Sequence, residues 1–209
     1  MKTMKKLFLL SMCCFLFFAG CQNKSETDAP VNAASGENGP AAKTKVKVET
    51  SLGEFIIELY SDRAPKTVEQ FLKNVNNARY NNSIIHDVVK DHQILIGGVS
   101  LDQGNPETFE MANEARADNP NLKWTVAMLH APDKTESDSM QFFINMKDNP
   151  ELNVIDDGAT SQTCGYCVFG IVAAGFNTLE QINQVPVVTT EKFEYAPQED
   201  IVITKISVE

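Results

Sequence analysis

Residues 53–75 read GEFIIELYSDRAPKTVEQFLKNV, a stretch that predicts a strand followed directly by a helix. A turn at 52–54 leads into the apolar run 55–60, which is typical of a strand. Pro65 stands in the first turn of the helix, where its missing N–H costs nothing. Apolar residues then recur at i, i+3, i+4 and i+7 and form one stripe: Val68, Phe71, Leu72 and Val75.

The rest of the chain from residue 44 onward predicts mostly short strands. They are expected at 46–50, 84–89, 93–96, 125–129, 141–146, 166–172 and 200–208. A second helix is expected over 178–184, with Asn177 as its cap. Strands interleaved with only two helices favour a closed antiparallel sheet over alternating strand–helix units.

Seven fragments in order along the chain from Lys45 carry a family resemblance. They are VETSLG at 48–53, APKTVEQFL at 64–72, Gly97-Gly98, Asn113-Glu114, TVAM at 125–128, QFFIN at 141–145 and GYCVFG at 165–170. In this order and spacing they resemble a cyclophilin-type peptidyl-prolyl isomerase. The resemblance implies a mainly β fold, a closed eight-stranded antiparallel barrel capped by two α-helices.

The same resemblance implies a reaction, rotation about the peptide bond that precedes proline. Amide resonance gives this bond a barrier of ~18–20 kcal/mol, and no covalent step, cofactor or metal is needed to lower it. The resemblance gives catalytic roles to Gln141, Phe143 and Tyr166. It also suggests an apolar slot for the proline ring, lined by Met128, Phe143, Leu152, Phe169, Ile94 and His130. The alternative for the hydrophobic residues is ordinary barrel core.

One position departs from the family where the chemistry is concentrated. The family motif Phe-His-Arg-Val reads Ile85-His86-Asp87-Val88, so Asp87 stands in place of an arginine that donates to the prolyl nitrogen. The chain has three arginines, Arg63, Arg79 and Arg116, and none falls within 80–115. We therefore expect weak isomerase activity. A non-catalytic module that binds proline peptides, and a purely structural lipoprotein, are the alternatives.

The N-terminus resembles a bacterial lipoprotein signal. Three lysines precede an apolar run over 7–18, and Ala19-Gly20 precedes Cys21, which would carry the lipid. The run is too short for a membrane-spanning helix, and an ordinary secretory signal is the alternative. By resemblance to lipoprotein sorting signals, Gln22 after the cysteine favours the outer membrane of the cell envelope. Residues 22–43 lack large apolar side chains except Val31, which is typical of a flexible segment.

These features divide the chain into three parts. Residues 1–20 are the expected signal peptide, 21–43 a lipidated flexible tether, and 44–209 the folded domain. Expected partners are proline-containing segments of exported proteins and, through Cys21, the membrane.

Charge and the remaining cysteines add further limits. Without the three leader lysines, 15 of the 18 Lys and Arg face 28 Asp and Glu, a net charge of −13 that argues against nucleic-acid binding. Cys164 and Cys167 have a C-x-x-C spacing. A redox motif needs its first cysteine at the start of a helix, but the residues after Cys167 have the sequence of a strand. A structural disulfide or two free thiols are therefore favoured over redox or metal chemistry.

Overall fold

A computed structural model describes residues 43–100, 107–155, 160 and 162–209. The predicted signal peptide, most of the tether and Cys21 lie outside the described residues. Within the described ranges, no helix is both long enough and apolar enough to cross a membrane.

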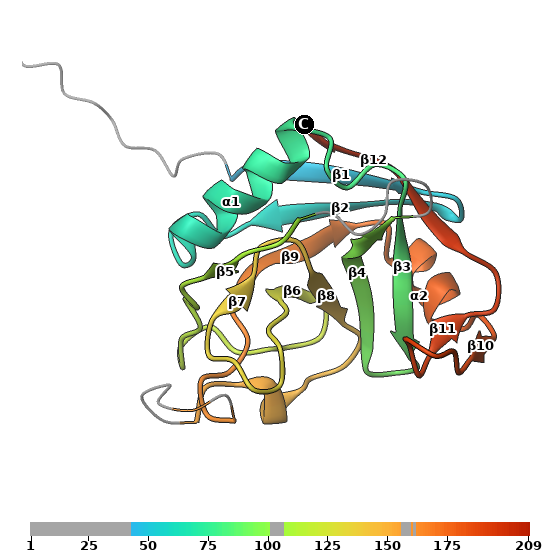
Figure 1. Ribbon diagram of the computed structural model, residues 1–209. Coiled ribbons are helices and arrows are strands. Elements are labelled where there is room, and N and C mark those ends of the chain that lie inside the picture. Colours follow the sequence, from blue (N-terminus) through green and yellow to red (C-terminus); the bar gives the residue numbers. More distant parts are fainter. Residues whose placement is uncertain (1–42, 101–106, 156–159, 161) are drawn as a thin grey trace, which may run out of the picture. The chain divides into compact units, whose positions relative to one another are not determined.

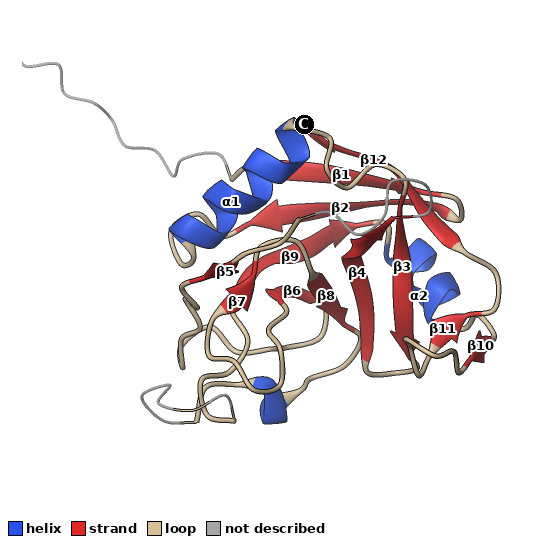
Figure 2. Cartoon of the chain, viewed as in Figure 1, coloured by secondary structure: helices blue, strands red, loops and turns tan. Residues whose placement is uncertain are grey.

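Eight antiparallel strands close into a barrel in the order β1-β12-β3-β4-β8-β6-β9-β2 (Figures 1 and 2). Their bounds are β1 Lys45–Thr50, β2 Gly53–Leu59, β3 Ser83–Val89, β4 Gln93–Ser100, β6 Thr125–Met128, β8 Phe142–Asn145, β9 Val168–Ala174 and β12 Ile201–Val208. Closure gives every barrel strand a neighbour on both sides, so the barrel itself has no edge strand. The expected closed eight-stranded barrel is confirmed.

Two α-helices pack on the barrel, α1 (Pro65–Asn76) against β12 and α2 (Phe176–Asn183) against β2 and β3. Of the expected stripe on helix α1, Val68, Phe71 and Val75 are buried and Leu72 is partly buried. Helix α2 is capped by Gly175 and not by Asn177. Gly175 has φ +82°, and a Cβ there would lie 2.4 Å from the Glu54 carbonyl oxygen, so only glycine fits this close approach.

The remaining elements are short. They are β5 (Glu110–Met111), β7 (Ser137–Asp138), β10 (Val187–Val188), β11 (Ala196–Pro197) and the 3₁₀ turn Pro150–Leu152. Strands β5 and β7 form one two-stranded sheet, and β10 and β11 form another. Strand β11 lies against β3, which brings the β10–β11 hairpin to the part of the barrel that carries Asp87.

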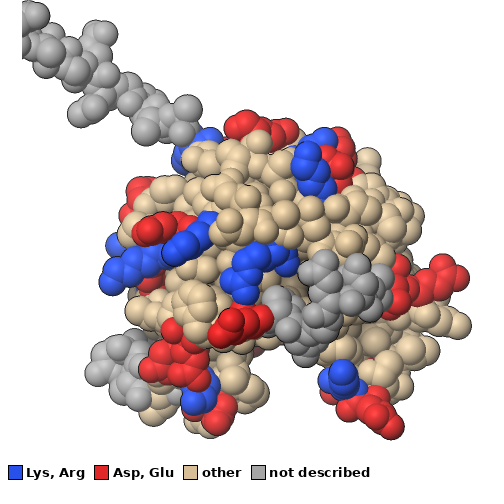
Figure 3. All heavy atoms as spheres, turned by 45° about the horizontal axis from the view of Figure 1, so that its top comes forward, with Lys and Arg blue, Asp and Glu red and all other residues tan. Residues whose placement is uncertain are grey.

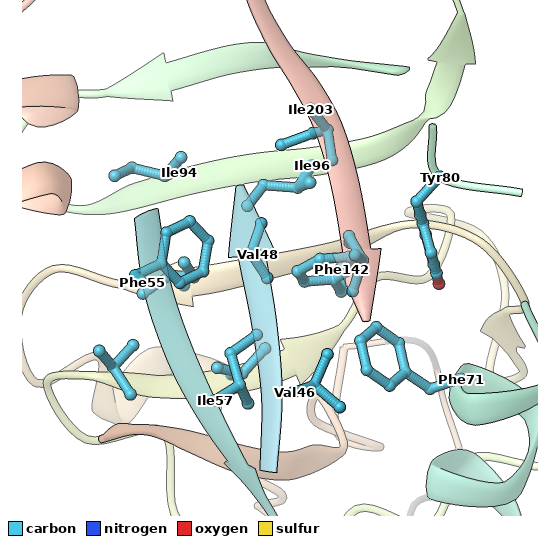
Figure 4. Close-up of a cluster of buried hydrophobic side chains, with 14 of the residues drawn as sticks. Val46, Val48, Phe55, Ile57, Phe71, Tyr80, Ile94, Ile96, Phe142 and Ile203 are labelled. Atoms are coloured by element: carbon cyan, nitrogen blue, oxygen red, sulfur yellow. The ribbon is translucent and has the colours of Figure 1, made fainter. Parts of the chain in front are cut away.

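The barrel interior is filled by alternate side chains of its strands (Figure 4). Phe142 lies among Phe71, Tyr80 and Phe169, with ring centroids 5.5–6.1 Å apart. Full burial of a large hydrophobic side chain contributes ~1.5–3 kcal/mol, so this cluster stabilises the scaffold on which the outer face is built.

Charged side chains of both signs are interspersed on the face shown in Figure 3. Surface ion pairs include Lys43 with Glu58 at 2.7 Å and Lys123 with Glu180 at 3.3 Å. Exposed pairs of this kind contribute ~0–1 kcal/mol each, so the excess of acid bears on solubility more than on the fold.

Candidate active site

Five residues form a row across the barrel. In the strand register Asp87 pairs with Leu95, Leu95 with Phe143, Phe143 with Ala127, and Ala127 with Val168. Directly paired residues of antiparallel strands point to the same face of the sheet. Their sequence neighbours fill the barrel interior, so this row, the outer row, faces away from the interior.

The outer row is mainly an apolar cluster separate from the barrel core. Ala127, Phe143 and Val168 are fully buried within it. Partly buried residues cover them: Tyr60, Leu95, Leu129, Leu152 and Tyr166. The Tyr166 ring meets the Phe143 ring edge-on, with centroids 5.4 Å apart. Phe143, the expected floor of the proline slot, is therefore completely covered in this structure.

His130 extends this cover. Its ring stacks on Tyr166 at a centroid distance of 4.1 Å and an interplanar angle of 15°. His130 is 3% exposed, so it is buried. Burial raises the pKa of Tyr166, so its hydroxyl is protonated at neutral pH and can act as a donor.

Asp87 occupies the β3 end of the outer row. Its Oδ1 accepts a hydrogen bond of 2.8 Å from the backbone N–H of Tyr195, just before β11. Two strand spacings separate Asp87 from Phe143, which is ~10 Å between backbones. Burial raises the pKa of the Asp87 carboxyl, against the opposing hydrogen bond from Tyr195. An acidic group thus shares a face with Phe143.

Gln141 lies just before β8, two residues from Phe143 and hence on the same face. Its backbone N–H donates to Asp138 Oδ1 at 2.9 Å, and its Nε2 donates to Asp138 Oδ2 at 3.4 Å. The side chain lies over Gly98, where an added Cβ would be 2.4 Å from Gln141 Cγ. Gly98, with φ +70°, is thus required for the position of Gln141.

Three of the residues expected in the slot face the opposite way. Met128, Phe169 and Ile94 are fully buried in the barrel interior, where they cannot touch a ring bound on the outside. Strand alternation places Leu129, Val168 and Leu95 on the outer face instead. The period-two pattern of these strands could have shown which side chains face the barrel interior.

The other expected slot residues come together. Phe143, Tyr166 and Leu152 share the outer cluster, and His130 stacks on Tyr166. The Tyr166 N–H donates to the Leu152 carbonyl at 2.9 Å, which fixes the 3₁₀ turn beside the cluster.

A cation lies at the far end of the outer row from Asp87. The Arg63 guanidinium stacks over Tyr60 at 4.9 Å and donates to Asn119 Oδ1 at 3.2 Å. Asn119 in turn donates to the Val168 carbonyl at 2.7 Å. Asp87 on β3 and Val168 on β9 are four strands apart in both directions around the eight-stranded barrel, so they lie on opposite sides of it. Arg63 therefore does not replace the missing arginine at β3.

Cys164 and Cys167 are not bridged to one another. This excludes the structural disulfide between them in this structure. In the described part of the chain, no group of three or more His, Cys, Asp or Glu is placed to hold a metal ion.

A closed eight-stranded barrel with two helices and an outer apolar row defines a cyclophilin-like fold. A cyclophilin-type isomerase of Cryptosporidium parvum has this fold, with a TM-score of 0.64, 22% identity and coverage of 80% of this chain and 98% of that chain. A second crystal structure from the same organism, determined in the presence of the dipeptide Ala-Pro, has a TM-score of 0.64 and 24% identity.

The family model described as cyclophilin type peptidyl-prolyl cis-trans isomerase matches residues 45–208. Peptidyl-prolyl cis-trans isomerase B of Escherichia coli is 34% identical over 164 residues, 78% of this chain and 98% of that protein. The isomerase cyp18 of Streptomyces antibioticus is 35% identical over 164 residues, 78% of this chain and 97% of that protein. The chain belongs to the cyclophilin-type peptidyl-prolyl isomerase family, as the resemblance implied.

Proposed function

We propose that this protein is a lipid-anchored peptidyl-prolyl isomerase of the cell envelope, acting on exported proteins, with activity far below the family norm. The expectation of low activity rests on the position of Asp87. This residue lies in the outer row with Phe143, on the face expected to bind the substrate.

The physical reason is the charge that the reaction requires. As the X–Pro bond rotates, amide resonance is lost and the prolyl nitrogen becomes pyramidal, so a cationic donor there stabilises the rotated state. An ionised Asp87 carboxylate cannot donate a hydrogen bond. It also places a negative charge on the face where the reaction is helped by a positive one. Loss of one well-placed donor corresponds to ~10²–10³ in rate.

The remaining parts support binding of a proline segment. Phe143 supplies an apolar floor, Gln141 can both donate to and accept from a peptide, and Tyr166 keeps its hydroxyl proton. Because Phe143 is fully covered, one of the side chains that cover it must move before a proline ring can reach it. This cost adds to the loss of the donor.

The covered Phe143 and the missing arginine also support a second candidate function. In this function the protein binds proline segments without turning them over. The two are separated by measuring affinity and turnover on one X-Pro tetrapeptide: binding with a rate indistinguishable from buffer favours the binding module. Turnover at the family level would contradict both.

The anchoring part of the proposal rests on Lys2 to Cys21. Metabolic labelling with an alkyne fatty acid, followed by fractionation, tests it: the wild type is expected to carry label and sediment with membranes. Cys21→Ala is expected to lose both. Label retained in Cys21→Ala would contradict lipidation at this residue.

A further inference from the structure

The two cysteines of the domain are three residues apart but have different surroundings. Cys164 Sγ lies 3.7 Å from His130 Nε2, whereas Cys167 Sγ lies 3.5 Å from Thr67 Oγ1 on α1. Cys164 is 5% exposed and Cys167 is fully buried. Cys164 has a potential base in direct contact, whereas Cys167 contacts a hydroxyl that itself donates to Glu114 Oε2 at 2.8 Å.

The hydrogen bonds of His130 fix which ring nitrogen can act as that base. His130 Nδ1 lies 2.8 Å from the Ala131 carbonyl oxygen, which can only accept, so Nδ1 carries the proton. In the neutral imidazole, Nε2 is then an acceptor and faces the Cys164 thiol. This is the arrangement of an activated nucleophile: a thiol, a base within reach, and a third group that orients the base.

The protonation of the thiols makes the base important. Burial raises the pKa of the Cys164 thiol, against an opposing hydrogen bond from Asn113. Burial also raises the pKa of the Cys167 thiol, to about 11. Both are protonated at neutral pH, and because the thiolate is the reactive form, a proton acceptor decides which of them reacts.

We propose that Cys164 is an oxidation site at which His130 acts as general base toward a hydroperoxide. The Cys164 sulfur attacks the outer peroxide oxygen, a sulfur–oxygen bond forms and the oxygen–oxygen bond breaks. The thiol proton passes to His130 Nε2 and from there to the departing oxygen, which leaves as an alcohol, or as water from hydrogen peroxide. Sulfur is oxidised by two electrons to a sulfenic acid and the peroxide is reduced by two.

The site lies close to the predicted proline slot. Cys164 contacts His130, His130 stacks on Tyr166, and the Tyr166 ring meets Phe143. An added oxygen on Cys164 would therefore enter a packed series of contacts that ends at the slot floor.

The test uses the full-length protein in detergent, hydrogen peroxide and dimedone, with peptide-resolved mass spectrometry. Cys164 is expected to form the dimedone adduct at least tenfold faster than Cys167, which serves as the control within each sample. In urea the two rates are expected to become equal. His130→Gln is expected to slow the reaction of Cys164 at least fivefold and leave Cys167 unchanged.

A merely structural histidine gives the opposite result. If His130 only covered the thiol, its replacement would expose Cys164 and speed the reaction, and that result would overturn the proposal. Added imidazole is expected to restore part of the Cys164 rate in His130→Ala, which a packing role would not produce. A native wild-type rate ratio below tenfold overturns the proposal without any variant.

Discussion

The Asp87 carboxylate on β3 accepts a hydrogen bond of 2.8 Å from the backbone N–H of Tyr195. The two residues are 108 positions apart, and their contact joins the end of the outer row to the β10–β11 hairpin. Asp87 therefore has a structural partner in the fold as well as a place on the face proposed to bind substrate.

The charge of Asp87 is predicted to cost stability at neutral pH. Its pKa is raised on folding, so the folded state binds more protons than the unfolded state just above the ordinary pKa, and stability falls as pH rises through this range. Asp87→Asn keeps an oxygen that can accept from Tyr195 and removes the charge. We expect its melting temperature to exceed that of the wild type by more at pH 7 than at pH 3.5, as measured by calorimetry. An equal difference at both pH values would contradict this.

His86 is predicted to act in the opposite direction. Burial lowers the pKa of His86 to about 4. Between pH ~6.5 and 4 the imidazole is therefore protonated in the unfolded state but neutral in the folded state, and this favours unfolding. The free energy of unfolding should fall by roughly 3 kcal/mol between pH 6.5 and 4 from this residue alone. In His86→Leu, the free energy of unfolding measured by urea titration is expected to fall less steeply between pH 6.5 and 4 than in the wild type. An equally steep decrease of stability in the variant would show that His86 does not cause the decrease.

Gly98→Ala is predicted to damage both stability and site. The left-handed φ of +70° and the contact with Gln141 each disfavour a Cβ, and we expect a loss of roughly 1–3 kcal/mol in unfolding free energy. Weaker binding of an X-Pro peptide should accompany it, since Gln141 must shift. Gly175→Ala is the matched control, because it has a similar φ but meets Glu54 and Phe55. Equal loss of peptide affinity in both variants would argue against a role for Gln141.

Phe142 and Phe143 form a matched pair on opposite faces of β8. Both are fully buried, Phe142 in the barrel interior and Phe143 in the outer cluster. Replacing either with leucine should cost roughly 0.5–3 kcal/mol of stability. Only Phe143→Leu should also weaken binding of an X-Pro peptide, measured by titration calorimetry at a temperature where both variants are folded. A similar effect of Phe142→Leu would remove the basis for a slot at Phe143.

The sequence predicted the barrel and both helices because strand alternation, the apolar stripe of α1 and the resemblance agreed. It was harder to predict which side chains point into the barrel and which point outward. Met128 and Phe169 were expected in the slot because the resemblance selects segments, whereas the closed register decides which side of a strand faces out. The bond from Tyr195 to Asp87 joins distant segments with no shared pattern, so no local signal predicts it.

The most direct test of the central claim is the turnover of an X-Pro tetrapeptide by wild type, Asp87→Asn and Asp87→Arg, compared as kcat/KM. We expect wild type to be far below the family level and Asp87→Asn to rise only slightly. Asp87→Arg is expected to rise at least tenfold over Asp87→Asn, ~1.4 kcal/mol of transition-state stabilisation, because it restores a cationic donor. Family-level turnover by the wild type, or no gain in Asp87→Arg while its fold and peptide affinity are retained, would contradict the account.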